Sequence, residues 1–285
     1  MKVLLTGAKG QLGRCFSDRC PAGWDILATD SDALDITDLE QVLRAVAAYK
    51  PDFIVNAAAY TAVDKAEVEH DVASLVNEIG PKNLAVAAKE LGARLVHIST
   101  DYVFDGDAAA PYSEIAETNP LGVYGQTKLK GEQAVSQMLP EALIIRTAWV
   151  FSEYGNNFVK TMLRLAAGRD SLGIVADQRG CPTYAGDIAH AVITLLQRNA
   201  PGGIYHFCGD SEVSWNEFAE VIFTSALQQG VLEQVPIVNG ITTEQYPTPA
   251  KRPKYSVLNC AKVKSEGVEL SPWKDRVKYV VAHCQ

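Results

Sequence analysis

A glycine-rich turn near the start of the chain constrains the fold more than any other feature. Residues 2–6, KVLLT, are typical of a β-strand, and TGAKGQLG follows, with Gly7, Gly10 and Gly13 in the pattern GxxGxxG. Glycine lets the chain turn sharply off a strand, brings backbone close to a pyrophosphate, and lets the next helix pack on the sheet. A plain strand–helix turn is the alternative, but the place after the first strand favours dinucleotide binding.

The turn opens a regular alternation of apolar runs and amphipathic stretches in the first half of the chain. Further strands are predicted at residues 24–30, 51–60, 93–100 and 142–151, and helices at 10–20, 35–50 and 73–92. Strands that alternate with helices and are almost continuously apolar are typical of a parallel sheet buried on both faces. The pattern therefore predicts an α/β fold with a Rossmann-type, doubly wound parallel sheet.

The second half is less regular. Helices are predicted at residues 185–198 and 214–230, on either side of a short strand at 203–209. A proline-rich segment, YPTPAKRPKYSVL, and a terminal helix follow. We predict a dinucleotide-binding domain at 1–147, rejoined by about 185–208, and a smaller α/β substrate-binding domain over most of 148–285.

Composition narrows the classes of partner. The 285 residues carry a net charge of −8 and contain no basic stretch, which argues against nucleic acid or an anionic membrane as a partner. No apolar run approaches the ~18 residues of a membrane span, and the N-terminal run is too short for a signal peptide. Six cysteines without a CxxC spacing are typical of reduced thiols in a cytoplasmic protein.

The second predicted strand ends in Asp30, 17 residues after Gly13. An acid at this place accepts hydrogen bonds from the adenosine ribose and repels a 2′-phosphate, which favours NADH. Lys9, inside the glycine turn, would instead attract that phosphate. The two residues point in opposite directions, so the choice between NADPH and NADH stays open.

A hydroxyl, a phenol and an ammonium are predicted to converge at the end of the fourth strand. Thr100 and Asp101 follow that strand in HISTDYVFDG, and Tyr124 and Lys128 are one helical turn apart in VYGQTKLKGE. Reduction of a ketone needs a hydride on carbon and a proton on oxygen. A nearby ammonium lowers the pKa of a phenol, so Tyr124 is the predicted proton donor, with Thr100 holding the carbonyl oxygen.

These segments resemble the extended short-chain dehydrogenase/reductases over essentially the whole chain. The motifs TGAKGQLG, VNAAAYTAVDKAE, HISTDYVFDG, YGQTKLKGE, RTAWVF, GNNFVKTMLRLA and YPTPAKRPKYSVLN resemble, more narrowly, the reductases that complete the synthesis of nucleotide-linked L-rhamnose. The resemblance implies reduction of the C4 keto group of a nucleotide sugar with NADPH or NADH.

The resemblance also implies roles for individual residues. It makes Tyr124 the proton donor and Lys128 its partner, which also holds the nicotinamide ribose. It implies substrate contacts for Thr100, Asp101, Trp149 and Asn157, and Arg252 is predicted to pair with the nucleotide diphosphate. The implied cofactor contacts, beside the glycines, Asp30, Tyr124 and Lys128, are Gln11, Leu12, Asp35, Ile36, Ala57, Ala58, Ala59 and Tyr60.

One departure from the family pattern concerns a metal. Some relatives form a magnesium-bridged dimer through a glutamate shortly after the glycine turn, and Cys15 stands at the corresponding place here. Magnesium prefers oxygen ligands, so we predict no such metal. The resemblance leaves a homodimer open.

Two other interpretations remain. Related dehydratases have Thr-Asp-Glu where this chain has Thr100, Asp101 and Tyr102, and loss of the second acid favours reduction over elimination. Other nucleotide-sugar reductases and epimerases share the Tyr/Lys pair. The regulatory subunit of methionine adenosyltransferase also resembles these reductases, which leaves a non-catalytic NAD(P)-binding module as the alternative.

Overall fold

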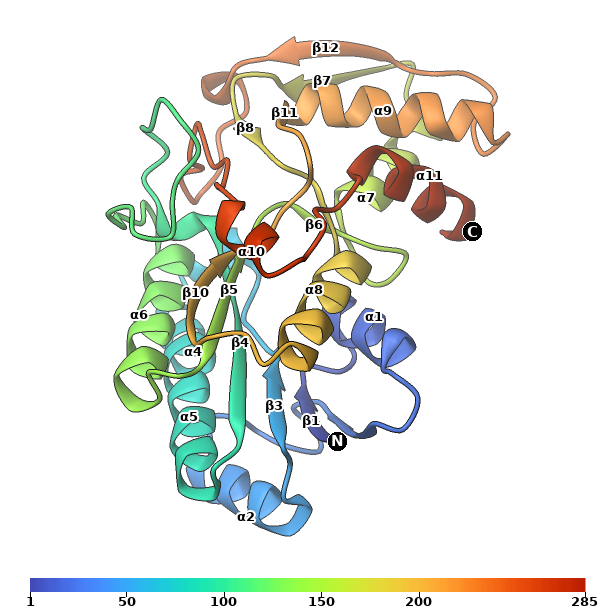
Figure 1. Cartoon of the computed structure of the whole chain (residues 1–285). Helices are drawn as coiled ribbons and strands as arrows, with labels where there is room; N and C mark the ends of the chain where they lie inside the picture. Colours follow the sequence, from blue (N-terminus) through green and yellow to red (C-terminus); the bar gives the residue numbers. More distant parts are fainter. Residues whose placement is uncertain (285) are drawn as a thin grey trace.

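A six-stranded parallel sheet forms the centre of the protein, whose computed structural model describes residues 1–284 (Figure 1). Its spatial order is β10-β5-β4-β3-β1-β2, and every neighbouring pair is parallel. The strands are β1 (Lys2–Thr6), β2 (Asp25–Thr29), β3 (Phe53–Asn56), β4 (Arg94–Thr100), β5 (Leu143–Thr147) and β10 (Gly203–His206). The predicted doubly wound α/β sheet is thereby confirmed.

The strand order reverses between β1 and β3. The chain runs from β1 outward to β2, then returns to place β3 on the other side of β1, with Thr6 opposite Asn56. A hydrogen bond of 2.7 Å from Thr6 Oγ1 to Asn56 Oδ1 joins the two carboxyl ends. Ligands of doubly wound sheets bind at this kind of reversal, outside the carboxyl ends of the strands.

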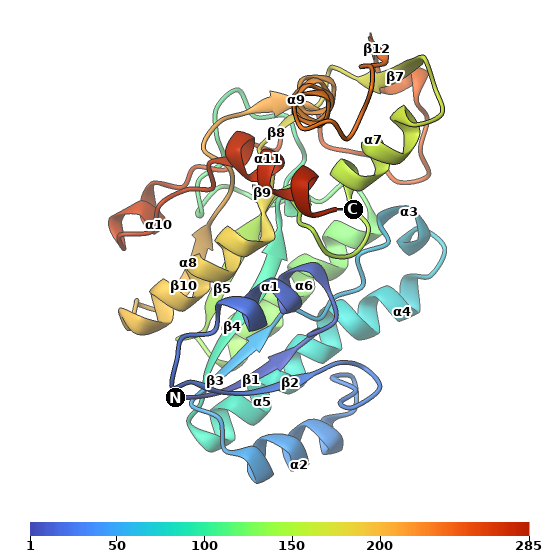
Figure 2. The same ribbon diagram turned by 90° about the vertical axis from the view of Figure 1, so that its right-hand side faces the viewer.

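Helices cover both faces of the sheet (Figure 2). One face packs on α1 and α8 through a core that includes Leu5, Phe16 and Val192, and the other packs on α2, α5 and α6 through Leu4 and Leu84. The bounds are α1 (Gln11–Arg19), α2 (Leu39–Tyr49), α5 (Gly80–Leu91), α6 (Val123–Met138) and α8 (Ala185–Gln197). Because both faces are buried, β1 and β3 carry consecutive buried apolar residues, at 3–5 and 53–55.

The single helix predicted at residues 73–92 is wrong in one respect. The structure has α4 (His70–Ser74), a π-helical turn η1 (Leu75–Ile79) and then α5. Pro81 has no N–H for the α-helical bond to the carbonyl of Asn77, so a wider turn forms there. The bulge leaves the Asn77 carbonyl against Gly131, where a Cβ would lie 2.1 Å away.

The fifth predicted strand is also divided. β5 ends at Thr147 and a short β6 (Val150–Phe151) follows, because Trp149 takes a left-handed backbone conformation with φ +47°. An extended strand cannot pass through that conformation. The break turns the chain out of the central sheet.

Most of the remaining elements build a second layer above the carboxyl ends of the strands (Figure 1), whereas α10 packs on β10 of the central sheet. The core of the second layer contains Phe218, Trp273 and Val277, all completely buried. The remaining helices are α3 (Val63–Ala66), η2 (Asp101–Val103), α7 (Phe158–Ala166), α9 (Trp215–Gln228), η3 (Thr243–Gln245), α10 (Ala261–Ser265) and α11 (Trp273–His283). The strands are β7 (Ser171–Val175), β8 (Arg179–Gly180), β9 (Thr183–Tyr184), β11 (Val213–Ser214) and β12 (Ile237–Ile241).

The chain passes from the sheet to the second layer more than once: it leaves the sheet after β5, returns to form β10, and then leaves again. This path agrees with a return of the chain at about residues 185–208, while the exact division into two domains stays a prediction. Within residues 1–284, no helix has the length and apolar character needed to cross a membrane.

Candidate active site

The glycine turn is shaped by two glycines that nothing larger can replace. Gly7 has φ +70°, and a Cβ there would lie 2.5 Å from the backbone nitrogen of Ala58. A Cβ on Gly13 would lie 2.2 Å from the carbonyl oxygen of Gly7. A Cβ on Gly10 would lie 3.3 Å from its nearest neighbour. Gly7 and Gly13 are therefore needed for packing, whereas Gly10 keeps the surface of the turn open to a ligand.

The turn leads into α1 with the amino end of the helix facing the cavity. Gly10 is the N-cap and has no side chain to satisfy the first N–H groups of the helix. Gln11 and Leu12 line the cavity beside it. Unsatisfied N–H groups and the positive end of the helix dipole make this a site for an anion such as pyrophosphate.

Asp30 lies at the end of β2 and supports the turn. Its Oδ2 accepts a hydrogen bond of 2.8 Å from the backbone N–H of Lys9, and its Oδ1 accepts one from Ser31. The Lys9 ammonium forms an exposed ion pair with Asp32 at 2.5 Å. Lys9, Asp30, Asp32 and Arg14 also line a second hollow of about 490 Å³. Two acids and two cations therefore lie together where the sequence predicts the adenosine ribose.

The end of β3 forms the wall opposite the turn. Asn56 Oδ1 accepts a hydrogen bond of 3.1 Å from the N–H of Ala58, and Asn77 Oδ1 accepts one of 2.8 Å from the N–H of Tyr60. The π-helical turn thus places an asparagine that holds the segment from Ala57 to Tyr60. The sequence pattern of residues 73–92 did not predict that Asn77 would hold this segment.

Thr100 and Asp101 stand at the carboxyl end of β4, as predicted. Both are buried, and the Thr100 hydroxyl donates a hydrogen bond of 3.0 Å to Asp101 Oδ1. Asp101 Oδ2 is a buried acceptor without a hydrogen-bond partner among residues 1–284. Burial raises the pKa of Asp101 to about 6, while hydrogen bonds from Ser256 and Thr100 oppose the rise.

Tyr124 and Lys128 lie one turn apart on α6 and line the same cavity as Thr100. Lys128 is buried, and its ammonium donates a hydrogen bond of 2.6 Å to the carbonyl oxygen of Ile98 on β4. Burial lowers the pKa of Lys128 to about 8, and Glu132 opposes this shift. The predicted convergence of hydroxyl, phenol and ammonium is therefore present in the structure.

The expected depression of the phenol pKa is not found. Burial raises the pKa of Tyr124 to about 12, the carboxyl of Asp101 adds to the rise, and the Thr100 hydroxyl opposes it. Desolvation of the phenolate outweighs the stabilisation that a neighbouring cation could give, and the Lys128 ammonium is bonded to a backbone carbonyl instead. Tyr124 is thus a protonated phenol at neutral pH, the form that a proton donor needs.

A buried ion pair supports α6 from below. Glu132 accepts hydrogen bonds from Arg146 Nε at 3.0 Å and Nη2 at 2.7 Å, and it also accepts one from Ser99. Both charged side chains are almost completely buried. A bidentate pair of this kind fixes geometry, and removal of one partner would leave an uncompensated buried charge.

Two stacked tryptophans form one wall of the cavity, and the sequence predicted only one of them, Trp149. Trp149 stacks on Trp215 with ring centroids 3.5 Å apart and planes 5° from parallel, and both line the cavity with Phe158. A Cβ on Gly180 would lie 2.4 Å from the Trp149 ring, so this glycine makes room for the indole. Trp215 and Phe158 are the first residues of α9 and α7, and no local pattern indicates that they meet Trp149.

Three predicted site residues do not line the cavity. Gly13 is a packing glycine of the turn. Arg252 Nη1 and Nη2 contact the two carboxylate oxygens of Asp64 at 2.5 and 2.8 Å, and the pairing of Arg252 with a nucleotide diphosphate stays a prediction. Asn157 caps α7 and bonds to Gln11, Ser152 and Tyr154. Its side chain is committed to protein groups rather than open to a substrate.

All other predicted site residues surround one cavity of about 900 Å³. They are Gly7, Gly10, Gln11, Leu12, Asp30, Asp35, Ile36, Ala57, Ala58, Ala59, Tyr60, Thr100, Asp101, Tyr124, Lys128 and Trp149. The cavity runs from the glycine turn across the carboxyl ends of β3 and β4 to the aromatic wall. Tyr102 also lines it, with its ring edge on Tyr124 at 5.5 Å between centroids.

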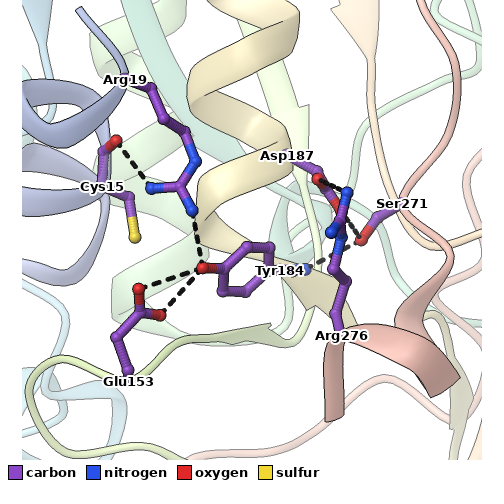
Figure 3. A network of polar contacts seen from close by, with 7 residues as sticks. All are labelled: Cys15, Arg19, Glu153, Tyr184, Asp187, Ser271 and Arg276. Carbon is purple, nitrogen blue, oxygen red and sulfur yellow. Dashed lines mark hydrogen bonds and ion pairs between the residues drawn. The ribbon is translucent and has the colours of Figure 1, made fainter. Parts of the chain in front are cut away.

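Cys15 of α1 does not line this cavity and belongs to a polar network (Figure 3). Its thiol is buried, which raises the pKa to about 12, and its carbonyl accepts a hydrogen bond of 3.1 Å from Arg19. Arg19 also donates to the hydroxyl of Tyr184, which donates to Glu153. The prediction that this place binds no magnesium stays a prediction.

A dinucleotide turn, a strand-end threonine and a Tyr/Lys pair in one cavity define a class. They are the parts of an NAD(P)-dependent oxidoreductase built on a doubly wound sheet.

Comparison with known proteins assigns the family. The family described as RmlD substrate binding domain matches residues 1–285, and the chain belongs to this family. The chain is similar to a dTDP-4-dehydrorhamnose reductase from Aggregatibacter actinomycetemcomitans, with 47% identity over 100% of this chain and 99% of that protein.

Two solved structures agree. A dTDP-4-dehydrorhamnose reductase from Clostridium acetobutylicum superposes with a TM-score of 0.93 at 42% identity, over 99% of each chain. One from Bacillus anthracis, in complex with NADP, has a TM-score of 0.93 at 39% identity, over 99% of this chain and 98% of that one. The predicted resemblance to the rhamnose-forming reductases is confirmed.

Proposed function

We propose that this protein is an NAD(P)H-dependent reductase that converts dTDP-4-dehydro-L-rhamnose to dTDP-L-rhamnose. The observation that carries the proposal is the meeting of Thr100, Tyr124 and Lys128 beside the glycine turn in one cavity. The names of full-length relatives at 41–47% identity support the same reaction. The product is a sugar donor for polysaccharide synthesis.

The residues of the cavity fit a nicotinamide dinucleotide. Gly10 leaves the turn open, the amino end of α1 carries N–H groups for a pyrophosphate, and Asp30 stands at the end of β2 for a ribose. Lys128, deeper in the cavity, can hold the second ribose. When bound, the reduced cofactor supplies the hydride for the sugar carbon.

The chain supplies the proton. Tyr124 is protonated at neutral pH, and its hydroxyl can donate to the sugar C4 oxygen as that oxygen gains negative charge. The Thr100 hydroxyl can hold the same oxygen in line. The Lys128 ammonium, one helical turn from Tyr124 in the same cavity, can stabilise the phenolate that remains after transfer, before solvent returns the proton.

The aromatic wall supports recognition of the nucleotide sugar. Stacked Trp149 and Trp215 present a flat apolar surface at one end of the cavity, and Asp101 presents a free carboxyl oxygen at its floor. Flat rings suit a sugar or base face, and the carboxyl oxygen suits a sugar hydroxyl. Tyr102 fills the position where the dehydratases have a second acid, which favours reduction over elimination.

A turnover assay tests the proposal. The purified protein, dTDP-4-dehydro-L-rhamnose and either NADPH or NADH should show cofactor oxidation at 340 nm and form dTDP-L-rhamnose. Oxidation with neither cofactor, in a protein that binds both, would instead identify a non-catalytic binding module of the kind represented by the regulatory subunit of methionine adenosyltransferase.

Two further properties belong to the proposal. We infer a cytoplasmic location, supported by six free cysteines, and a nucleotide-sugar substrate made inside the cell. A homodimer is open to direct measurement by light scattering coupled to gel filtration. Added EDTA should leave the measured mass unchanged if no magnesium joins two copies.

A further inference from the structure

We propose that Asn157 and Ser152 are positioning residues that orient the side-chain amide of Gln11, so that its NH₂ group donates to the pyrophosphate of the dinucleotide. The inference rests on the proposed function, since it concerns the same cofactor site. It assigns Asn157 to cofactor binding through Gln11, in place of a direct substrate contact.

The orientation of the Asn157 amide follows from the backbone. Its Oδ1 accepts a hydrogen bond of 3.2 Å from the N–H of Lys160, as the N-cap of α7. Its Nδ2 donates to the carbonyl oxygen of Ser152 at 2.7 Å. A backbone N–H can only donate and a carbonyl can only accept, so the two ends of this amide cannot be exchanged.

The orientation of Gln11 follows from that of Asn157. Asn157 Nδ2 also donates to Gln11 Oε1 at 3.0 Å. The completely buried Ser152 hydroxyl has one proton and two acceptors in reach, Gln11 Oε1 at 3.0 Å and the carbonyl oxygen of Tyr154 at 3.1 Å. A rotated Gln11 would direct its NH₂ group at the Asn157 NH₂ group. Asn157 thus fixes the oxygen of Gln11, the Ser152 hydroxyl is a second donor to it, and the NH₂ of Gln11 has no acceptor among residues 1–284.

Gln11 stands at the place where a donor is useful. It is the first residue of α1, directly after Gly10, and it lines the cavity. The backbone N–H groups of this turn face the same anion. An NH₂ group held beside them adds a donor to a charged oxygen, which is stronger than a donor to a neutral one.

The segment from Ser152 to Asn157 is held against α1 by hydrogen bonds and by close packing. Tyr154 donates a hydrogen bond of 2.8 Å to Asp18, and Glu153 accepts one of 3.0 Å from Tyr184, which is held by Arg19 (Figure 3). Gly155 has φ +60°, and a Cβ there would lie 3.2 Å from Gln11 Cγ. The segment therefore packs on the Gln11 side chain, and its hydrogen bonds fix its position relative to α1.

The test uses a substitution that keeps the helix cap. Asn157→Ser retains a neutral oxygen to cap α7 but is too short to reach Gln11. Asn157→Ala loses both the cap of α7 and the hydrogen bond to Gln11, so its difference from Asn157→Ser measures the effect of the cap. Ser152→Ala removes the second donor to Gln11. Dissociation constants for NADPH, ADP-ribose and AMP are measured by titration calorimetry, together with the melting temperature of each variant.

Gln11→Ala should weaken NADPH and ADP-ribose about tenfold, the loss of one hydrogen bond to a charged group, and leave AMP within twofold. Asn157→Ser should weaken the same two ligands about fivefold at an unchanged melting temperature. In the Gln11→Ala background, Asn157→Ser should have no further effect, because residues that act through one another are not additive.

Equal affinities of Asn157→Ser and the wild type for ADP-ribose would overturn the inference, as would an undiminished effect in the Gln11→Ala background. If Asn157→Ser does not fold, Ser152→Ala in both backgrounds decides the question by the same criteria. These titrations need no sugar substrate, so a wild type that binds NADPH but reduces nothing would refute the proposed function alone. A wild type that binds no NADPH would refute both.

Discussion

The two layers of the molecule are built on different principles. The cofactor side is a parallel sheet whose elements follow local sequence patterns: β1 and β3 carry consecutive apolar residues, and the turn after β1 depends on Gly7 and Gly13. The substrate side has short two-stranded pieces joined by aromatic contacts such as Trp149 on Trp215. Under the proposed function, the first layer would hold its ligand mainly with backbone groups of the glycine turn, and the second mainly with aromatic side chains.

The difference teaches where tolerance to substitution should lie. A backbone-lined site fails when space is filled, because the backbone cannot move away. A side-chain-lined site fails when a side chain is removed. The proposed catalytic groups Thr100, Tyr124 and Lys128 lie between the two layers, on β4 and α6, where they could contact both ligands.

The largest effect is expected at this junction. Tyr124→Phe removes the proton donor but keeps the ring that meets Tyr102. Positioned proton transfer contributes 10²–10⁴-fold, so kcat should fall by roughly that factor. Steady-state kinetics with the keto sugar measure the loss, and NADPH titration should remain within a few-fold of wild type. A variant with near-normal kcat would remove Tyr124 from the reaction.

A pair of glycine substitutions breaks the cofactor layer in two distinct ways. Gly13→Ala puts a Cβ 2.2 Å from a carbonyl oxygen, so the free energy of unfolding should fall by about 3 kcal/mol or more. Gly10→Val leaves the fold intact but fills the space that a pyrophosphate must approach, and NADPH affinity should fall sharply. Urea unfolding and titration of the same two proteins separate the effects. Normal cofactor binding by folded Gly10→Val would contradict the assignment of the turn.

The pH dependence of stability isolates Asp101. Its folded pKa of about 6 is above the ordinary 3.8, so the folded state binds the proton more tightly. The stabilisation is complete below about pH 3.8 and is lost as the pH rises to 6. Asp101→Asn, which cannot ionise, should gain up to about 3 kcal/mol relative to wild type between pH 4 and pH 7, at 1.36 kcal/mol per pKa unit.

Chemical denaturation of both proteins at several pH values measures this difference. A difference that does not change with pH would mean that Asp101 keeps an ordinary pKa in the folded protein. Ser256→Ala offers a matched comparison, because loss of that hydrogen bond should raise the pKa of Asp101 further.

The substrate layer is tested by Trp215→Leu. Loss of the stacked ring removes about 1 kcal/mol of aromatic interaction with Trp149, and we expect the KM for the keto sugar to rise about fivefold. The dissociation constant of NADPH should not change, in contrast to Gly10→Val. Weakened NADPH binding with an unchanged sugar KM would reverse the assignment of the two layers.

The smallest effect concerns cofactor choice. Asp30→Ala should weaken NADH, because a ribose acceptor is lost, and Lys9→Ala should weaken NADPH, because a cation beside the 2′-phosphate is lost. An exposed interaction of about 1 kcal/mol corresponds to roughly fivefold in each case. Titration with both cofactors gives the ratio. If Asp30→Ala lowers the affinities for NADH and NADPH equally, Asp30 serves only to hold the turn through its hydrogen bond with Lys9.

The sequence by itself determined the order of strands and helices, the glycine turn and the Tyr124/Lys128 pair. Each is a local pattern: a period of apolar residues, a place without room for a side chain, or a spacing of one helical turn. Even one local effect was missed, since Pro81, which lacks an N–H, replaces part of the predicted helix with a π-helical turn.

Only the tertiary structure decided which side chains meet. Asn157 bonds to Gln11 across 146 residues and Arg252 pairs with Asp64 across 188, and neither distance leaves a trace in local periodicity. The direction in which the Tyr124 pKa shifts also depends on burial, which the one-turn spacing to Lys128 does not reveal. Hydrogen bonds and desolvation act through space, so partners far apart in the chain are chosen by the packed fold rather than by any short stretch of sequence.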